Sequence, residues 1–207
     1  MTALLVIAKA PVAGRAKTRL CPPCTAEEAA RLAEAALADT LDTVAATPCT
    51  RRVLVLEGPV GPWLPDGFDV VPQVDGGLDV RLAGAFAAVD EPALLVGMDT
   101  PQVSPADLTV ALESLERADA VLGPADDGGW WAVGLQRSDP DVFLGVPMSE
   151  PDTGIRQLDR LRARGLDPTL LPSHRDVDTF DDALAVAGLA PDSAFAVAVS
   201  SLNGADR

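Results

Sequence analysis

Short apolar runs of the strand type alternate with helical patterns along the chain, and this alternation limits the folds that are open to it. The runs that predict strands are 3–8, 52–56, 69–71, 93–97, 120–123 and 130–135. The patterns that predict helices are 27–46, 79–89, 105–117, 153–164 and 179–187. Strands joined by crossover helices form a mostly parallel sheet with helices on both faces, so the sequence predicts a three-layer α/β/α fold.

Several predicted helices begin with explicit capping signals. These signals are Thr25-x-x-Glu28, Ser104-x-x-Asp107 and Thr179-x-x-Asp182. A chain of 207 residues fits one α/β domain. The stretches 58–67 and 137–151 are rich in Pro, Gly and Asp, which indicates loops within a domain. We therefore expect residues 1–207 to form a single domain.

The composition excludes several classes of protein. Hydrophobic residues make up 48% of the chain, which is enough to bury a core. The 16 basic and 31 acidic residues leave a net charge of −15, which argues against nucleic acids and anionic membrane surfaces as partners. No apolar run approaches the roughly 18 residues that a membrane helix needs. Lys9 follows the first apolar stretch, unlike the charge of a secretory signal, so we expect a cytoplasmic protein.

The first predicted strand runs into the most basic segment of the chain. Residues 1–20 hold no acid, and their cations are Lys9, Arg15, Lys17 and Arg19. Open α/β sheets bind ligands at the carboxyl ends of their strands, where Arg and Lys can bind phosphate oxygens and Gly14 would allow a close backbone approach. The Walker P-loop pattern is absent. The segment predicts a polyphosphate site, and a solvated basic turn is the alternative.

Acidic residues follow other predicted strands or lie near the start of a helix. Asp99 follows the apolar run 93–97, and Asp176 and Asp178 precede the last predicted helix, at what we expect to be a strand-to-helix junction. Carboxylates in such positions can bind a divalent cation that bridges phosphate oxygens. Turn or capping aspartates are the alternative for each segment taken alone.

A glycine turn enters an aromatic strand near residues 123–135. The candidate residues for an acceptor or sugar pocket are Asp126, Asp127, Gly128, Gly129 and Trp130. The glycines would let the backbone approach a ligand, and either aspartate could bind sugar hydroxyls or a metal or accept a nucleophile's proton. The alternative is an Asp-Gly hairpin turn whose two tryptophans, Trp130 and Trp131, pack on opposite faces of the sheet.

Three cysteines and one histidine leave little room for other chemistry. Cys21 and Cys24 form a C-x-x-C spacing before a helix, which can support redox work, but we interpret them as packing residues. Cys49 and His174 lie too far along the chain to complete an obvious zinc site with them. Whether the first two form a disulfide is left open.

Four segments, in this order, resemble the nucleotidyltransferase and GT-A glycosyltransferase superfamily. They are Lys-x-Pro-x-x-Gly-x-x-Lys-Thr-Arg-Leu from Lys9, Gly-x-Asp-x-Pro from Gly97, Asp-Gly-Gly and an aromatic strand from Asp127, and Asp-Val-Asp-Thr from Asp176. The set looks like a bacterial family of GT-A-type transferases, domain of unknown function 2064, whose members are often described as glycosyltransferases. That family is similar to phospholactate guanylyltransferase and the molybdenum-cofactor nucleotidyltransferases. The resemblance covers nearly residues 2–190 and implies a nucleotide-diphospho-sugar transferase-like fold.

The resemblance also implies roles for particular residues. The nucleotide and its phosphates would be bound by Lys9, Gly14, Arg15, Lys17, Arg19, Gln73 and Arg81, with Gln73 near the base. Asp99 matches the family's metal ligand, Asp178 the distal ligand, and Asp176 is the second choice for that position. Departures from the family's usual pattern are Met98, Thr100, Asp79-Val80, Met148 and Phe180.

The function that the resemblance implies is a divalent-metal-dependent nucleotidyltransferase, with Mg²⁺ or Mn²⁺ as its cofactor. It would use a nucleoside triphosphate and a small phosphorylated or hydroxylated acceptor, with Lys17 and Asp127 as the expected catalytic residues. One alternative is a GT-A glycosyltransferase that uses a nucleotide sugar, and another is a nucleotide-binding module without turnover. We expect a monomer or a homodimer.

Overall fold

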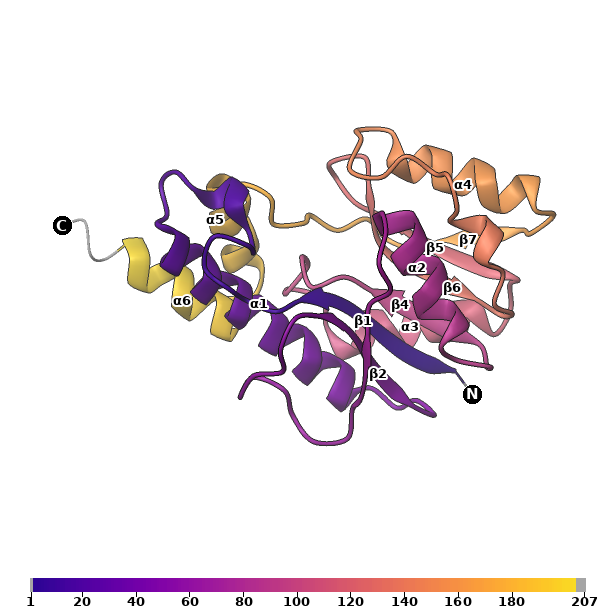
Figure 1. Ribbon diagram of the computed structural model, residues 1–207, viewed down its shortest axis with the longest axis horizontal. Coiled ribbons are helices and arrows are strands. Elements are labelled where there is room, and N and C mark those ends of the chain that lie inside the picture. The colour runs from indigo at the N-terminus through magenta and orange to yellow at the C-terminus, as the bar shows by residue number, and fades with distance from the viewer. Residues whose placement is uncertain (1, 204–207) are drawn as a thin grey trace.

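A seven-stranded sheet forms the centre of the structure, a computed structural model that describes residues 2–203 (Figure 1). The strand order is β3-β2-β1-β4-β6-β5-β7, and only β6 runs antiparallel to its neighbours. The strands are β1 (Ala3–Lys9), β2 (Arg52–Glu57), β3 (Asp69–Pro72), β4 (Ala93–Val96), β5 (Ala120–Pro124), β6 (Trp130–Leu135) and β7 (Pro168–Leu170). The prediction of a mostly parallel sheet is confirmed.

Helices cover both faces of this sheet. They are α1 (Ala26–Ala46), α2 (Leu78–Ala87), α3 (Pro105–Leu115), α4 (Thr153–Ala163), α5 (Phe180–Leu189) and α6 (Ala194–Asn203), with short 3₁₀ turns η1 (Thr18–Leu20) and η2 (Pro140–Val142). The three predicted capping signals form reciprocal capping boxes, which start α1, α3 and α5. Within residues 2–203, no helix is both long and apolar enough to cross a bilayer.

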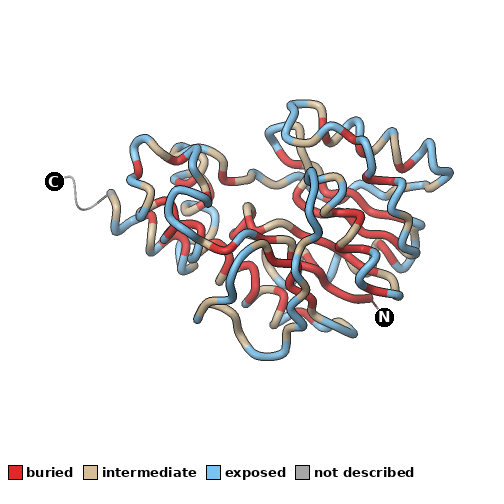
Figure 2. The backbone as a smooth tube through the Cα atoms, viewed as in Figure 1, coloured by how far each residue is buried: buried red, intermediate tan, exposed pale blue. Residues whose placement is uncertain are grey.

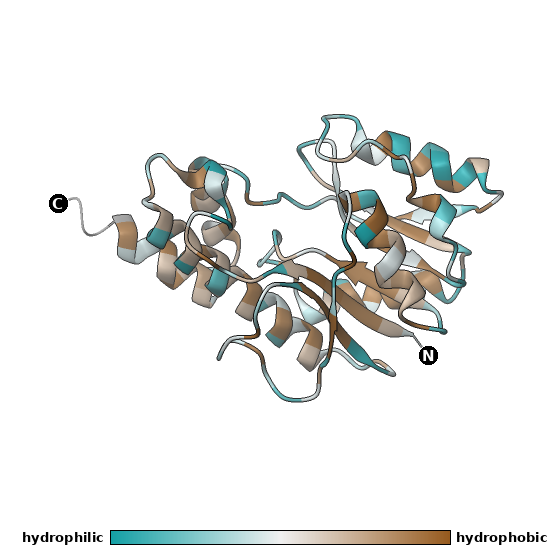
Figure 3. Ribbon diagram, in the orientation of Figure 1, coloured by the Kyte–Doolittle hydropathy of each residue, from teal (hydrophilic) through white to brown (hydrophobic). Residues whose placement is uncertain are grey.

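The core is divided by the sheet into two layers. Leu4 and Val6 of β1 point to one face with residues of α1 and α3, whereas Leu5 points to the other face with residues of α2 and α4. Figure 2 shows the central strands β1, β2, β4, β5 and β6 as largely buried, and Figure 3 shows mostly hydrophobic residues along them, whereas the edge strands β3 and β7 are mostly exposed. Trp131 belongs to the first layer and Trp130 packs against the second, as the hairpin alternative predicts.

A third apolar cluster joins the two ends of the chain. The first half of α1 packs against α5 and α6, and Leu20 and Cys24 from the segment before α1 complete the cluster. Figure 1 shows these helices together at the side of the molecule away from α4. The segment between β7 and α5, which contains Asp176 and Asp178, crosses from the sheet to α5 (Figure 1).

The structure corrects the sequence prediction in two places. The acidic segment 176–178 does not follow a strand directly, because β7 ends at Leu170 and only an isolated bridge between Ala125 and His174 extends the pairing. The helix α6 and the strand β7 were not predicted from the sequence. The α6 segment is almost wholly apolar over its first turns and shows no polar stripe, and β7 is too short to show alternation.

Candidate active site

A cleft of about 590 Å³ opens at the carboxyl ends of the parallel strands. Segments far apart in the sequence meet there: the loop after β1, the ends of β3 and β4, the turn between β5 and β6, and the segment before α5. The predicted site residues that line it are Lys9, Arg15, Lys17, Arg19, Gln73, Arg81, Asp99, Asp127, Gly129, Trp130, Asp176 and Asp178. Gly14, Asp126 and Gly128 do not line it.

Lys17 is the most enclosed cation of the basic loop. Its backbone is in the left-handed region, with φ 48° and ψ 39°, directly before the turn η1. Its side chain is only 10% exposed, and the ammonium lies 2.5 Å from Asp99 Oδ1 and also donates to the carbonyl of Val177. The Val177 N–H in turn donates to the Asp99 carbonyl at 2.8 Å. Lys17 therefore lies between the two acidic segments of the site.

Arg19, two residues further on, pairs with the distal acidic segment. Its Nη1 lies 2.6 Å from Asp178 Oδ2. The basic loop is thus joined to both candidate metal-binding segments by ion pairs, Lys17 to Asp99 and Arg19 to Asp178. Cations and carboxylates line one cleft, which is the arrangement that a metal-bridged polyphosphate requires.

Three carboxylates gather at one side of the cleft. Asp127, Asp176 and Asp178 each place one carboxylate oxygen within 4.8 Å of the others. Burial, together with the charges of Asp127 and Asp178, raises the pKa of Asp176 to about 6. Burial is the largest cause of this shift, and the two neighbouring carboxylates add to it.

This group differs in part from the predicted pair of metal ligands. It contains Asp178 and the second choice, Asp176, and it adds Asp127, which we expected to be catalytic. Asp99 lies outside the group and is instead the ion-pair partner of Lys17, with half of its side chain exposed. Sequence spacing could not show that Asp127 lies beside Asp176 and Asp178, because the turn that carries Asp127 meets the segment 176–178 only in the folded chain.

The turn between β5 and β6 separates its two aspartates. Asp127 accepts a hydrogen bond from the Gly129 N–H at 2.7 Å and faces the cleft. Asp126 instead accepts one from the Ser173 hydroxyl at 2.6 Å. Gly128 has a φ of 91°, and a Cβ there would meet the Pro151 carbonyl oxygen at 1.9 Å, so this glycine allows two loops to pack.

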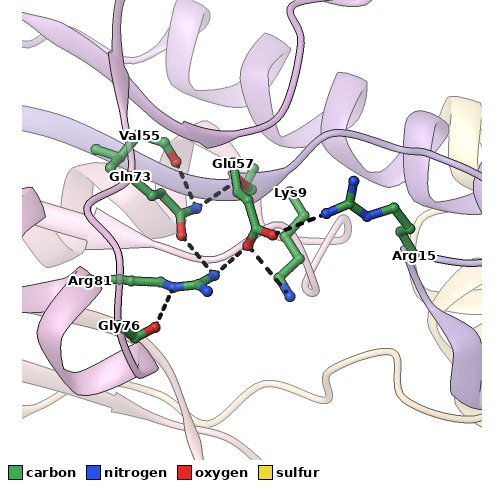
Figure 4. A network of polar contacts seen from close by, with 8 residues as sticks. Lys9, Arg15, Val55, Glu57, Gln73, Gly76 and Arg81 are labelled. Atoms are coloured by element: carbon green, nitrogen blue, oxygen red, sulfur yellow. Dashed lines mark hydrogen bonds and ion pairs between the residues drawn. The ribbon is translucent and has the colours of Figure 1, made fainter.

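The opposite side of the cleft is basic and is organised by a residue that the sequence analysis missed. Glu57, at the end of β2, pairs with Lys9 at 3.6 Å, with Arg15 at 3.9 Å and with Arg81 (Figure 4). Partial burial raises the pKa of Glu57, but the charges of Lys9 and Arg81 outweigh that effect, and the net shift is downward. An acid directly after a predicted strand was the available signal, the same one that identified Asp99.

The cysteines lie outside the cleft. Cys24 is buried in the cluster between α1, α5 and α6, and burial raises the pKa of its thiol. Cys21 donates to the Thr25 carbonyl at 3.4 Å. All three cysteines are free thiols in the structure. A raised pKa leaves less of the reactive thiolate, which agrees with the interpretation of a packing pair.

Solved structures share this fold. A proposed nucleotide-diphospho-sugar transferase from Desulfovibrio desulfuricans G20 is 26% identical, with a TM-score of 0.84, and the match covers 100% of this chain and 96% of that one. CMP:2-keto-3-deoxy-manno-octonic acid synthetase in complex with CTP matches at 12% identity and a TM-score of 0.58, over 92% of this chain and 99% of that one. The Rv0371c protein of Mycobacterium tuberculosis H37Rv, in complex with manganese, matches at 23% identity and a TM-score of 0.53, over 90% and 98% of the two chains. The last two likenesses show the fold alone.

The family comparison agrees with the resemblance that the motifs predict. No curated protein matched the sequence. The model of the family described as "Uncharacterized protein conserved in bacteria (DUF2064)" matches residues 30–150, which is more than half of the chain. With the GT-A-like sheet and the paired basic and acidic loops in place, this match shows that the chain belongs to the bacterial family DUF2064.

Proposed function

We propose that the protein is a divalent-metal-dependent nucleotidyltransferase that uses a nucleoside triphosphate and a small phosphorylated or hydroxylated acceptor. The observation that carries the proposal is the cleft itself, in which the cations of the loop after β1 lie against carboxylates at the carboxyl ends of the strands. Structural neighbours that are nucleotidyl- or nucleotide-sugar transferases support the prediction of a transferase. One of them was solved with a bound nucleoside triphosphate, CTP.

The residues around Lys17 suit the binding of a polyphosphate. Arg15 and Arg19 have side chains that are 74% and 64% exposed, so both can turn toward a ligand without breaking the core. Lys17 is held in place by two acceptors and presents a fixed charge. We assign the two arginines to phosphate binding in the ground state and Lys17 to the phosphate that departs.

The donor set fits a hard divalent cation. The oxygens of Asp127, Asp176 and Asp178 lie within 4.8 Å of one another, and Mg²⁺ and Mn²⁺ prefer carboxylate oxygens as ligands. We propose that Asp178, together with at least one of Asp99, Asp127 and Asp176, would hold the cation. A bound cation would neutralise phosphate oxygens there. The neighbour solved with manganese supports this choice of metal.

The transfer itself breaks one bond and forms another. An acceptor oxygen attacks the α-phosphorus, the bond from that phosphorus to the bridging oxygen breaks, and pyrophosphate leaves with the electron pair. Lys17 donates to the departing phosphate as its charge grows. Where the acceptor is a hydroxyl, Asp127 takes its proton, because Asp127 faces the cleft and Asp126 does not. An ionised phosphate acceptor needs no base.

A GT-A glycosyltransferase is the second candidate. It is favoured by one observation, the neighbour proposed to be a nucleotide-diphospho-sugar transferase, which matches over the whole of this chain. In that reaction the leaving group is a nucleoside diphosphate instead of pyrophosphate. The same residues of the basic loop would bind it.

A thermal-shift screen tests the proposal. Nucleoside triphosphates and nucleotide sugars are each added with Mg²⁺, with Mn²⁺ and with EDTA, and a ligand at 100 times its dissociation constant should stabilise the fold by about 2.7 kcal/mol. We expect a shift that needs the metal and that is reduced in Arg15→Ala. The control Arg117→Ala, which changes an exposed arginine just after α3, should keep the full shift.

Product analysis then separates the candidates. Release of pyrophosphate supports the nucleotidyltransferase, and release of a nucleoside diphosphate from a nucleotide sugar supports the glycosyltransferase. Binding without any product would leave a nucleotide-binding module. No shift with any nucleotide would contradict the proposed function.

A further inference from the structure

The basic side of the cleft is a connected network of five side chains, which we call the Glu57 network: Lys9, Arg15, Glu57, Gln73 and Arg81 (Figure 4). Glu57 is its centre, because it pairs with all three cations. Glu57 itself does not line the cleft, whereas the other four residues do. Its carboxylate therefore acts on a ligand only through the residues that it holds.

Gln73 has little freedom to bind a ligand with its amide nitrogen. Its Nε2 donates to the carbonyls of Ala8 at 2.7 Å and Val55 at 3.2 Å, so both amide hydrogens are used on the backbones of β1 and β2. Its oxygen faces Arg81 Nη1 at 3.4 Å. The side chain thus fixes Arg81 and leaves the direct recognition of a ligand to that arginine.

Arg81 is held at two of its three nitrogens. Its Nε donates to the Gly76 carbonyl at 2.9 Å, and its Nη1 pairs with Glu57 and Gln73. Within residues 2–203, Nη2 has no hydrogen-bond partner, and Figure 4 shows it turned away from the other contacts. A guanidinium fixed in this way presents donors in one direction at the wall of the cleft.

The surface around Arg81 suits a flat ring. On α2, Leu78 lies one turn before Arg81 and Leu82 directly follows it. Ile7 lies on β1, next to Ala8, whose carbonyl accepts from Gln73. All three line the cleft. The carboxylates that fit the metal belong to other segments of the wall, after β4, between β5 and β6, and before α5. An apolar wall with one fixed cationic donor is the chemistry of a nucleobase subsite.

We propose that Glu57 is a positioning residue that aims Arg81 at a nucleobase, so that the site selects a base with a carbonyl at position 6 of a purine or position 4 of a pyrimidine. The inference rests on the proposed nucleotide binding. A carbonyl oxygen accepts from the free donors of Arg81, whereas the amino group of adenine or cytosine at that position would place donors against donors. The Glu57 carboxylate keeps the guanidinium from turning to the phosphates instead.

The test compares nucleotides that differ only at this position and in the hydrogen on the neighbouring ring nitrogen, N1 of the purine or N3 of the pyrimidine. Dissociation constants are measured by calorimetry in Mn²⁺ for ITP against ATP, for UTP against CTP, and for inorganic tripolyphosphate. ITP and ATP share the sugar, the phosphates and the purine ring, so their ratio reports the base contact. We expect ITP to bind about tenfold or more tightly than ATP, the size of one good base contact.

Two variants and a control assign the effect to the Glu57 network. In Glu57→Gln and in Arg81→Lys, the ITP to ATP ratio should fall toward one, while tripolyphosphate binds at least as well to Glu57→Gln as to the unchanged protein. Asp69→Asn is the matched control, because Asp69 begins β3 at the amino end of that strand, does not line the cleft and, among residues 2–203, forms an ion pair only with Arg51, at 2.5 Å. It should keep the ratio.

The outcomes are distinct. Equal binding of ITP and ATP, or a preference for ATP, would overturn the inference and leave the proposed nucleotide binding intact. So would a ratio that either Glu57→Gln or Arg81→Lys retains, or a loss of tripolyphosphate binding equal to the loss of nucleotide binding. Failure of every nucleotide and of tripolyphosphate to bind would overturn the proposed function as well.

Discussion

Lys17 owes its position to its own backbone and to two acceptors from distant segments. The left-handed conformation turns the chain into η1, and Asp99 and the Val177 carbonyl hold the ammonium in place. A preorganised charge of this kind stabilises charge that develops in a transition state, typically by about 3 to 4 kcal/mol. This is why we assign Lys17 to catalysis and the exposed arginines to binding.

Kinetics of single variants test this assignment. Lys17→Ala should lower kcat on the order of 10²-fold or more and change the nucleotide KM much less. Arg15→Ala should mainly raise KM, since an exposed side chain can bind phosphate equally in the ground state and the transition state. If Lys17→Ala raises KM and leaves kcat untouched, Lys17 is a docking charge only.

Asp176 gives the site a pH-dependent stability. Its pKa is raised to about 6 in the folded protein, so the folded state binds the proton more tightly than the unfolded state does. The free energy of unfolding therefore falls as the pH rises from about 4 through about 6, because Asp176 ionises in a site that disfavours its charge. This destabilisation is complete above that range.

The variant Asp176→Asn removes the destabilisation that the ionised Asp176 carboxylate causes. In EDTA, we expect it to raise Tm at about pH 7.5, and to raise it less at about pH 4.5, where the carboxyl of the parent protein is protonated. Differential scanning fluorimetry at the two pH values measures the difference. A variant that is less stable than the parent at about pH 7.5 would contradict the account.

The sequence predicted individual site residues where a strand ended in a charged side chain. Asp99 and the cations of the basic loop were found in this way, and all of them line the cleft. Glu57 met the same criterion and was overlooked, because its partners Arg15 and Arg81 come from the loop after β1 and from α2, far from it in the sequence. The proximity of Asp127 to Asp176 depends on tertiary packing and leaves no trace in spacing.

At the scale of elements, the segment between the basic loop and α1 is a packing unit. Cys24 is buried in the cluster that joins α1 to α5 and α6, and its raised pKa keeps the thiol protonated. We expect Cys21→Ser/Cys24→Ser to keep most of the turnover once a donor is known. Complete loss of activity with an unchanged circular dichroism spectrum would show that the thiols have a chemical role.

The C-terminal helix is tied to α1 by one carboxylate. Asp39 accepts hydrogen bonds from the N–H groups of Ala194 at 3.0 Å and Phe195 at 2.7 Å, at the start of α6. Asp39→Ala should cost about 1 kcal/mol, as the loss of a helix cap does, and lower Tm by about 2–4 °C. Thermal melts check this, with the exposed Asp42→Ala on the same helix as the control. An unchanged Tm would show that α6 is held by its apolar contacts alone.

Most elements could be predicted because their periodicity and caps act locally. The capping boxes at Thr25, Ser104 and Thr179 each involve residues three apart, so the sequence shows them directly. The helix α6 was missed because its apolar residues do not form a stripe. Its start is capped locally by Ser193, which accepts from the Ala196 N–H at 3.0 Å, and also by Asp39, a residue 155 positions from Ala194. The serine cap is visible in the sequence, whereas the contact with Asp39 spans a range that a window of sequence cannot show.

At the scale of the whole molecule, positive charge is concentrated in one segment although the chain as a whole is acidic. The chain carries a net charge of −15, yet both of its lysines and two arginines lie between the last residue of β1, Lys9, and Arg19. The sheet order places this loop at the centre, because β1 lies between β2 and β4, and its end faces the cleft. The fold thus concentrates the cations where the carboxyl ends of the strands meet.

A crystal structure with a non-hydrolysable nucleoside triphosphate and Mn²⁺ tests the central claim most directly. We predict an anomalous manganese peak at coordination distance, about 2.0 to 2.6 Å, from an Asp178 oxygen and from at least one of Asp99, Asp127 and Asp176. The triphosphate should contact Lys17 and Arg15. A nucleotide bound outside the cleft, or a metal with none of these carboxylates within reach, would contradict the account.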